Sequence, residues 1–250
     1  MIVLKTSREL SVMRKAGIIS QKALRLAGEA VEPGVSTWEI DKLVRQYIES
    51  EGAAPSFLGY DGYPASTCIS VNSVVIHGIP KKSVILKKGD IVSIDVGAYY
   101  EGFHGDNAWT FPCGEISAEA QALLDATERS LFLGIEQARP GNRVGDVGRA
   151  VQEYVEARSY SVVREWTGHG VGADMHEDPS VPNYGTPGRG ARLTAGMVIA
   201  IEPMINQGRR EIEIKPDGWT VVTKDGSLSA HFEHTVAITP GGPVILTLPD

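Results

Sequence analysis

The chain has 250 residues, of which 42% are hydrophobic and 22% are charged. This composition is typical of a folded globular protein and excludes long disordered or low-complexity tracts. The formal net charge of −7 argues against a nucleic-acid-binding protein, because such a protein needs a basic face that displaces counterions from phosphates.

The N-terminal sequence and the cysteines indicate the compartment. The chain does not open with a basic segment followed by a long apolar one, and no apolar run approaches the roughly 18 residues of a membrane span. The two cysteines, Cys68 and Cys113, do not form the pattern of a disulfide framework. We therefore expect free thiols and a cytoplasmic protein without membrane contact.

Helical patterns occur four times along the chain. Thr6 with Glu9, and Ser36 with Glu39, have the spacing of capping boxes and predict two helix starts. Apolar residues then recur at helical spacing. The expected helices cover about 7–29, 39–49, 118–137 and 146–156, and a strand-rich stretch covers about 193–238. The predicted class is α+β.

Two passages of the sequence recur at one offset. The helical passage 33–49 matches 140–156, and the strand passage 89–95 matches 196–202, in both cases 107 residues later. Either match alone could arise by chance. The shared offset indicates a duplicated unit.

The duplication predicts how the chain is organised. We expect a single catalytic domain over residues 1–250, with an internal repeat of about 33–95 and 140–202. Two halves related by a pseudo-twofold axis would bring equivalent strand ends together. Asp95 and Glu202, which end the two matched strands, should then face one central cleft.

The segment 90–106 has the pattern of a β-hairpin that carries two carboxylates. If its turn centres on Tyr100-Glu101, Asp95 and Asp106 lie directly opposite each other on one face. Directly opposed like charges destabilise a ribbon, and burying them adds several kcal/mol. Bound cations would remove this cost. A proton-sharing acid pair of the aspartic-protease type is the alternative.

Further metal-ligand types follow along the chain. His169 lies in the Gly-rich stretch 167–172, and His176 follows seven residues later. Such a stretch could instead cradle phosphate, but it lacks the Walker lysine and the full Rossmann spacing. Glu202 and Glu233 lie in apolar runs, where a lone glutamate is usually a structural hydrogen-bonding group. The other histidines assigned to structure are His104, His231 and His234.

Taken together, four acids in apolar strands and one Gly-flanked imidazole predict a metal centre. Oxygen-rich ligation with one histidine suits two divalent ions drawn from Mn, Fe, Co and Zn. The predicted ligands are Asp95, Asp106, His169, Glu202 and Glu233.

Over nearly its whole length the sequence resembles the type I methionine aminopeptidases, which have the pita-bread metallopeptidase fold. The matching segments are Cys68-Ile69-Ser70-Val71-Asn72, Val75-Ile76-His77-Gly78-Ile79-Pro80, Asp95, Asp106, Thr167-Gly168-His169-Gly170, Met175-His176-Glu177, Ile201-Glu202-Pro203 and Phe232-Glu233-His234-Thr235. The resemblance implies two pseudo-twofold-related halves with a central antiparallel sheet covered by helices. It also implies removal of the initiator methionine from nascent chains whose second residue is small. Ribosome association is compatible with that substrate, and a monomer is expected.

The same resemblance implies a role for each site residue. Asp95 would ligate one ion, His169 and Glu202 the other, and Asp106 and Glu233 both. A bridging water of lowered pKa would attack the first peptide carbonyl, and Glu202 would manage its proton.

The resemblance also assigns the residues that would bind substrate. His77 would contact the scissile amide nitrogen, and His176 would stabilise the oxyanion. The implied methionine pocket consists of Phe57, Tyr60, Tyr63, Cys68, Met175 and Trp219. Phe57 and Met175 depart from the residues usual in the family, and Phe57 and Cys68 are the two that could be ordinary core.

Two other functions remain open from the sequence. A prolidase shares this kind of site and fold, but it usually carries a substantial N-terminal domain, whereas the catalytic half begins almost at residue 1 here. A non-catalytic pita-bread binding module would have lost metal ligands, and none of the five positions has changed.

Overall fold

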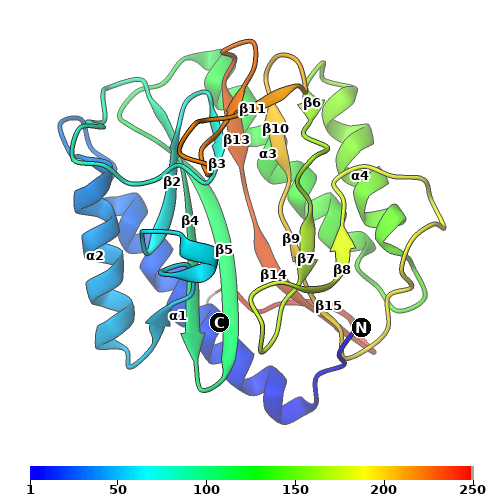
Figure 1. Ribbon diagram of the computed structural model, residues 1–250. Helices are drawn as coiled ribbons and strands as arrows, with labels where there is room; N and C mark the ends of the chain where they lie inside the picture. Colours follow the sequence, from blue (N-terminus) through cyan, green and yellow to red (C-terminus); the bar gives the residue numbers. More distant parts are fainter. Residues whose placement is uncertain (249–250) are drawn as a thin grey trace.

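The structure is a computed structural model that describes residues 1–248. Its helices are α1 (Ser7–Glu29), α2 (Thr37–Ser50), α3 (Ala118–Gln137) and α4 (Val144–Glu156). They lie on the outside of a set of antiparallel sheets (Figure 1). The α+β prediction and the four helix ranges are therefore confirmed. Within the described residues, no helix combines the length and apolar character needed to cross a bilayer.

Within residues 1–248, the strands form four sheets, all paired in antiparallel fashion. The first half supplies β1 (Ala54–Pro55), β2 (Thr67–Val71), β3 (Val74–Ile76), β4 (Ile91–Tyr100) and β5 (Phe103–Pro112), with a 3-10 turn, η1 (Tyr60–Gly62). The second half supplies β6 (Ser161–Val162), β7 (Gly168–Gly170), β8 (Glu177–Val181), β9 (Val198–Ile201), β10 (Met204–Asn206), β11 (Ile212–Ile214), β12 (Val221–Thr223), β13 (Ser229–His231), β14 (His234–Thr239) and β15 (Gly242–Ile245). The two largest sheets have the orders β1-β4-β2, with β5 on β4, and β15-β14-β9-β7-β8.

Local capping fixes where the first two helices begin. The Thr6 hydroxyl accepts from the backbone N–H of Glu9, and the Glu9 carboxylate accepts from the backbone N–H of Thr6 at 2.7 Å. Ser36 and Glu39 make the same exchange at the start of α2. Each cap contributes about 1 kcal/mol. Burial of the apolar helix faces contributes more, about 1.5–3 kcal/mol for each large side chain.

Two apolar clusters hold the helices against the sheets. One lies between α1, α2 and the β2–β4 sheet, and the other between α3, α4 and the β9–β14 sheet. Each half therefore packs its helices on its own sheet, which leaves the seam between the sheets for polar groups. Cys68 and Cys113 are buried and free, as predicted.

Backbone details recur in the two halves at the offset of the sequence repeat. The N–H of Gly34 donates to the carbonyl of Leu86 at 2.8 Å, and Gly141 donates to Leu193 at 3.0 Å. Gly34 and Gly141 have φ values of 97° and 98°, a conformation that glycine adopts without strain. Isolated bridges join Ser36 to Ile85 and Arg143 to Arg192. The numbers in each corresponding pair differ by 107.

The β4–β5 hairpin has a different register from the predicted one. Its turn is Glu101-Gly102, with φ values of 47° and 92°, and Tyr100 pairs with Phe103. Positive φ at both turn residues matches the twist of the flanking strands. Asp95 pairs with Ala108, and Asp106 pairs with Gly97.

The predicted direct opposition of Asp95 and Asp106 is therefore wrong. The sequence pattern placed the turn one residue too early, because glutamate is an uncommon first residue for such a turn. The error moves each partner by two residues, so both carboxylates still share one face of the ribbon. They are diagonal neighbours rather than an opposed pair.

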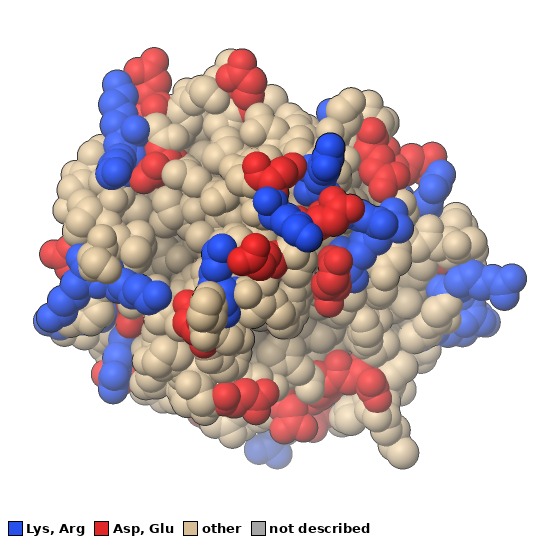
Figure 2. Space-filling model, turned by 45° about the horizontal axis from the view of Figure 1, so that its top comes forward, with Lys and Arg blue, Asp and Glu red and all other residues tan. Residues whose placement is uncertain are grey.

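Charged side chains are mixed on the face drawn in Figure 2. Acidic and basic residues are interspersed over much of this face, acidic residues gather along its lower edge, and no continuous basic stripe crosses it (Figure 2). This view of the surface is consistent with the acidic net charge of −7.

Candidate metal centre

The five predicted ligands line one cavity of about 500 Å³ at the seam between the two largest sheets. Asp95 lies on β4, Asp106 on β5 and His169 on β7, while Glu202 directly follows β9 and Glu233 lies between β13 and β14. Glu202 follows the end of its strand as predicted, but Asp95 lies in the middle of β4, so the prediction that it ends a strand is wrong. The ligands converge because the chain brings strands from both halves together at this seam.

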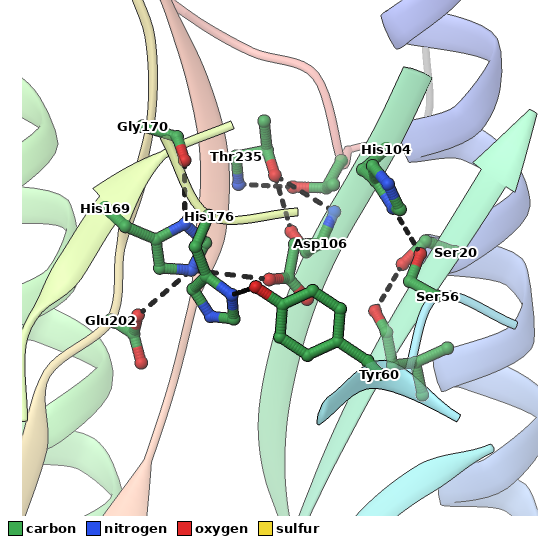
Figure 3. A network of polar contacts seen from close by, with 12 residues as sticks. Ser20, Ser56, Tyr60, His104, Asp106, His169, Gly170, His176, Glu202 and Thr235 are labelled. Carbon is green, nitrogen blue, oxygen red and sulfur yellow. Dashed lines mark hydrogen bonds and ion pairs between the residues drawn. The ribbon is translucent and has the colours of Figure 1, made fainter. Parts of the chain in front are cut away.

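Hydrogen bonds hold the two halves together at this point. The backbone N–H of Glu233 donates to the carbonyl of Ala108 on β5 at 2.8 Å. The Thr235 hydroxyl donates to the Asp106 carbonyl at 2.7 Å and accepts from the Asp106 N–H at 3.1 Å (Figure 3). Glu233 and Asp106 are therefore fixed relative to each other by a main-chain contact on one side and by the Thr235 hydroxyl on the other.

Three of the predicted ligands form a compact group. One ligand atom each from Asp106, His169 and Glu233 lies within 4.8 Å of the others, and all three residues are buried. His169 Nε2 lies 3.7 Å from Asp106 Oδ2 and 3.5 Å from Glu202 Oε1 (Figure 3). These separations are too long for good hydrogen bonds. They leave a space that a cation could share.

The other ring nitrogen of His169 fixes the orientation of the imidazole. Nδ1 lies 2.8 Å from the carbonyl of Gly170. A carbonyl only accepts, so the ring proton lies on Nδ1 and the lone pair of Nε2 points toward the carboxylates. This is the usual arrangement of a metal-binding histidine.

Several buried polar atoms at the site lack a hydrogen-bond partner in the structure. They are Asp95 Oδ1, Asp106 Oδ1 and Glu233 Oε1, together with His231 Nε2. Leaving a buried acceptor unsatisfied costs about 1–3 kcal/mol, and more for a charged group. Divalent cations would satisfy the carboxylate oxygens, so the donor set fits a metal centre.

The electrostatics of the carboxylates point the same way. Burial, reinforced by the neighbouring acids, raises the pKa of Asp106 and of Glu233 well above the usual range. Burial also raises the pKa of Asp95 to about 7. Burial opposes ionisation of Glu202 too, but the neighbouring imidazoles of His231 and His169 outweigh it and lower its pKa. The acids therefore need positive charge to ionise together.

His231 belongs to this environment, although the sequence pattern assigned it to structure. Its Nε2 lies 3.4 Å from Glu202 Oε2, and its side chain is 2% exposed. The only sequence feature that could have indicated a place at the site was its position two residues before Glu233. His104 and His234 bond instead to the hydroxyls of Ser56 and Thr247, at 2.8 and 2.9 Å, and neither lines the cavity.

One end of the cavity is apolar. Phe57, Tyr63, Cys68 and Met175 form a buried cluster against which Trp219 packs. Tyr63 and Trp219 meet edge-on, with ring centroids 5.1 Å apart. Cys68 pairs with Asp95 in the β2–β4 register, so the apolar cluster directly adjoins the carboxylates.

His77 and His176 also line the cavity, and Tyr60 lies at its mouth. His77 has a φ of 57°. Such left-handed conformations are uncommon for residues other than glycine and cluster at functional sites. Burial lowers the pKa of His77 to about 4. Burial, with a contribution from His169, lowers that of His176 to about 4, although His176 remains exposed at the mouth. Both rings are therefore neutral near pH 7.

Known proteins are similar to this chain in sequence and in fold. Residues 11–240 match metallopeptidase family M24. The methionine aminopeptidase of Clostridium perfringens is 56% identical over 248 residues, which cover 99% of this chain and 99% of that protein. The crystal structure of methionine aminopeptidase from Thermotoga maritima matches with a TM-score of 0.98 at 46% identity, covering 100% of both chains. Prolidase from Pyrococcus furiosus matches with a TM-score of 0.81 at 25% identity, covering 99% of this chain and 66% of that one.

Proposed function

The chain belongs to metallopeptidase family M24, and from this membership we propose that it removes the N-terminal methionine of nascent proteins whose second residue is small. It is a metalloaminopeptidase with the pita-bread fold, as the resemblance implied. One observation carries the substrate proposal. A single cavity joins a cluster of metal-ligand side chains to an apolar pocket that suits an unbranched thioether side chain.

The metal-holding residues in this proposal are Asp95, Asp106, His169, Glu202 and Glu233. Their four carboxylates would balance two divalent ions, and the ligand types suit Mn, Fe, Co or Zn. When bound, such ions would lower the pKa of a water molecule and polarise the peptide carbonyl. Glu202, whose lowered pKa keeps it ionised, would accept a proton from the attacking water at a carboxylate oxygen.

The substrate would be oriented by the neutral imidazoles. We assign His77 to the nitrogen of the scissile peptide bond and His176 to the oxygen of its carbonyl. A neutral ring carries one N–H and can stabilise a developing oxyanion by donating it. The low pKa values of His77 and His176 support these roles near neutral pH.

The apolar end of the cavity would bind the methionine side chain. Phe57, Tyr63, Cys68 and Met175 surround this space, with Tyr60 and Trp219 at its rim. Aromatic and sulfur-containing walls make favourable contacts with a thioether. Phe57 and Met175, the two departures from the family pattern, preserve that apolar character.

The substrate also suggests where the protein works. Initiator methionine is exposed on chains that are still being synthesised, so we place the activity in the cytoplasm, near the ribosome. We propose a monomer, because one chain contributes every residue assigned to the cavity.

Peptide cleavage separates this function from the alternatives. The purified protein, loaded in turn with each candidate metal, should release methionine from Met-Ala-Ser and should leave X-Pro dipeptides intact. The opposite preference would identify a prolidase. Metal binding without cleavage of either peptide would favour a non-catalytic module. Titration of the metal against activity would give the number of ions.

A further inference from the structure

The N-terminal segment of the chain reaches the loop that carries His176. We propose that Lys5 is a positioning residue, whose buried ion pair with Glu177 holds His176 in the orientation that the reaction requires. The inference rests on the proposed function, because that function gives His176 its task.

The ion pair is almost completely enclosed. The Lys5 ammonium group contacts Glu177 Oε2, and the two side chains are 2% and 9% exposed. Lys5 Nζ also donates to the carbonyl of Val3 at 3.2 Å. The backbone N–H of Lys5 donates to the carbonyl of Gly196 at 2.7 Å. Lys5 thus links two parts of the site. One is the turn before β9, the strand that leads to Glu202, and the other is Glu177, the residue after His176.

Glu177 is held from two directions. Its backbone begins β8 and pairs with Gly170 of β7, beside His169. Its side chain turns back toward Lys5. The ring of His176 then lies 4.2 Å from the ring of His169, between centroids. A shift of Glu177 would therefore move His176 relative to the metal centre.

The loop before His176 packs directly under the ion pair. A Cβ atom at Gly172 would lie 2.1 Å from Glu177 Oε1 and 2.6 Å from Lys5 Cε. Only glycine allows such a close approach. The Gly172 carbonyl accepts from the His104 N–H at 2.9 Å. The loop is therefore clamped between the hairpin that bears Asp106 and the Lys5–Glu177 pair.

Stability alone does not explain a buried ion pair. Removing both charges from water carries a large desolvation penalty, and a well-packed apolar pair is often as stable or more stable. What an ion pair adds is a directed contact between two particular atoms. Because the pair lies beside His176, we infer that its role is to orient the His176 ring.

The test removes the charge of Lys5 and asks whether the effect passes through His176. Lys5→Met keeps the side-chain length, and we expect it to lower kcat for Met-Ala-Ser about tenfold, since small misplacements of catalytic groups cost up to about 100-fold. KM and metal affinity should change little, because His176 acts on the transition state. Lys5→Arg should restore most of the rate.

A double-mutant cycle provides the decisive comparison. In a His176→Ala background, Lys5→Met should lower kcat no further. Lys88→Met is the matched control, because Lys88 forms an exposed ion pair with Glu115, and it should leave kcat unchanged. If Lys5→Met lowers kcat equally with and without His176, the positioning role is overturned.

A readout independent of activity separates this inference from the proposed function. The nitrogen-15 NMR signals of the His176 ring, assigned with His176→Ala, should shift in Lys5→Met and return in Lys5→Arg. A Lys5→Met, Glu177→Met double variant, which leaves no unpaired buried charge, should show the same shift if Lys5→Met alone does not fold. Unchanged ring signals would overturn the inference. Shifted signals in a protein that releases no methionine would support it and reject the function.

Discussion

The hydroxyl of Tyr60 lies 2.8 Å from Nδ1 of His176, at the mouth of the metal-ligand cavity (Figure 3). The neutral His176 ring carries one proton. If the hydroxyl donates to Nδ1, that proton lies on Nε2, where it can be donated to a substrate oxygen. Tyr60 would then determine which nitrogen of His176 faces the reaction.

Tyr60→Phe tests this relationship. The substitution keeps the aromatic wall but removes the hydroxyl, so we expect kcat to fall by about 10-fold or more, toward the 10²–10³-fold cost of losing an oxyanion donor. KM for Met-Ala-Ser should change less than kcat. Steady-state kinetics check both values. Tyr99→Phe, on the exposed end of β4, is the control. A lower affinity with an unaltered kcat would show that Tyr60 acts only as a pocket wall.

Asp106→Asn tests the metal centre itself. Asp106 belongs to the compact ligand group, so we expect turnover to be abolished and metal binding to weaken strongly. In the wild type, metal at 100 times its Kd should add about 2.7 kcal/mol, equivalent to a rise in Tm of roughly 5 to 10 °C for a protein of this size. Thermal melts with and without a chelator measure this. Near-normal turnover in Asp106→Asn would disprove the assignment.

Stability of the metal-free protein should depend on pH in an unusual direction. Burial raises the pKa of Asp95 to about 7 in the folded state, well above an ordinary aspartate, so this carboxyl binds its proton more tightly in the folded than in the unfolded chain between about pH 4 and 7. The contribution of Asp95 to the free energy of unfolding therefore falls as the pH rises through this window. His77 and His176, whose pKa values are lowered to about 4, act in the opposite direction below about pH 6.5, so the effect of Asp95 has to be measured by difference.

Thermal melts of chelator-treated protein at pH 5 and at pH 7.5 measure this pH dependence. We expect Asp95→Asn to raise the Tm relative to the wild type by more at pH 7.5 than at pH 5, because only the wild type must ionise a buried Asp95 at the higher pH. Saturating metal should reverse or cancel the trend, because cations favour the ionised acids. An equal Tm difference between the wild type and Asp95→Asn at the two pH values would contradict the raised pKa of Asp95.

Local signals explain which parts of the fold could be predicted. The starts of α1 and α2 follow from capping boxes, which involve residues three positions apart. The hairpin register could not be predicted as reliably, because Glu101 adopts a positive φ that its residue type does not favour. An error of one residue in the turn was enough to separate two carboxylates that the pattern had opposed.

Contacts between distant segments account for what the sequence did not reveal. The ligand types of the metal centre could be recognised because each lies in an unusual apolar or Gly-rich context. His231 reaches Glu202 only through the pairing of β13 with β10, in which Met204 opposes His231. Lys5 and Glu177 are 172 residues apart, and no local pattern links them. Such pairs become visible only when tertiary packing is known.

His231 should tune the proton acceptor. Its Nε2 lies 3.4 Å from Glu202 Oε2, and this neighbouring imidazole helps to lower the pKa of Glu202, so His231→Gln should raise that pKa. Because ionised Glu202 is the active form, the acid limb of the pH–rate profile should move to higher pH, and kcat should fall more at pH 6 than at pH 8. His234→Asn, which alters a contact with Thr247 outside the cavity, should leave the profile in place. An unmoved acid limb in His231→Gln would mean that Glu202 does not control it.

The final prediction concerns the second residue of the substrate. The cavity of about 500 Å³ must hold the methionine side chain, the metal ions and the scissile bond between His77 and His176. The next side chain should then lie against the rim residues Tyr60 and Trp219, and excess volume in a packed site typically costs 1–3 kcal/mol. Met-Ala-Ser and Met-Gly-Ser should therefore be cleaved with a kcat/KM at least about 100-fold above that of Met-Lys-Ser or Met-Phe-Ser, a ratio equivalent to roughly 2.7 kcal/mol.

Trp219→Ala, which removes a large side chain at the rim, should reduce this difference in kcat/KM while weakening methionine binding. Equal rates for alanine and phenylalanine at the second position in the wild type would show that the cavity does not select by size there.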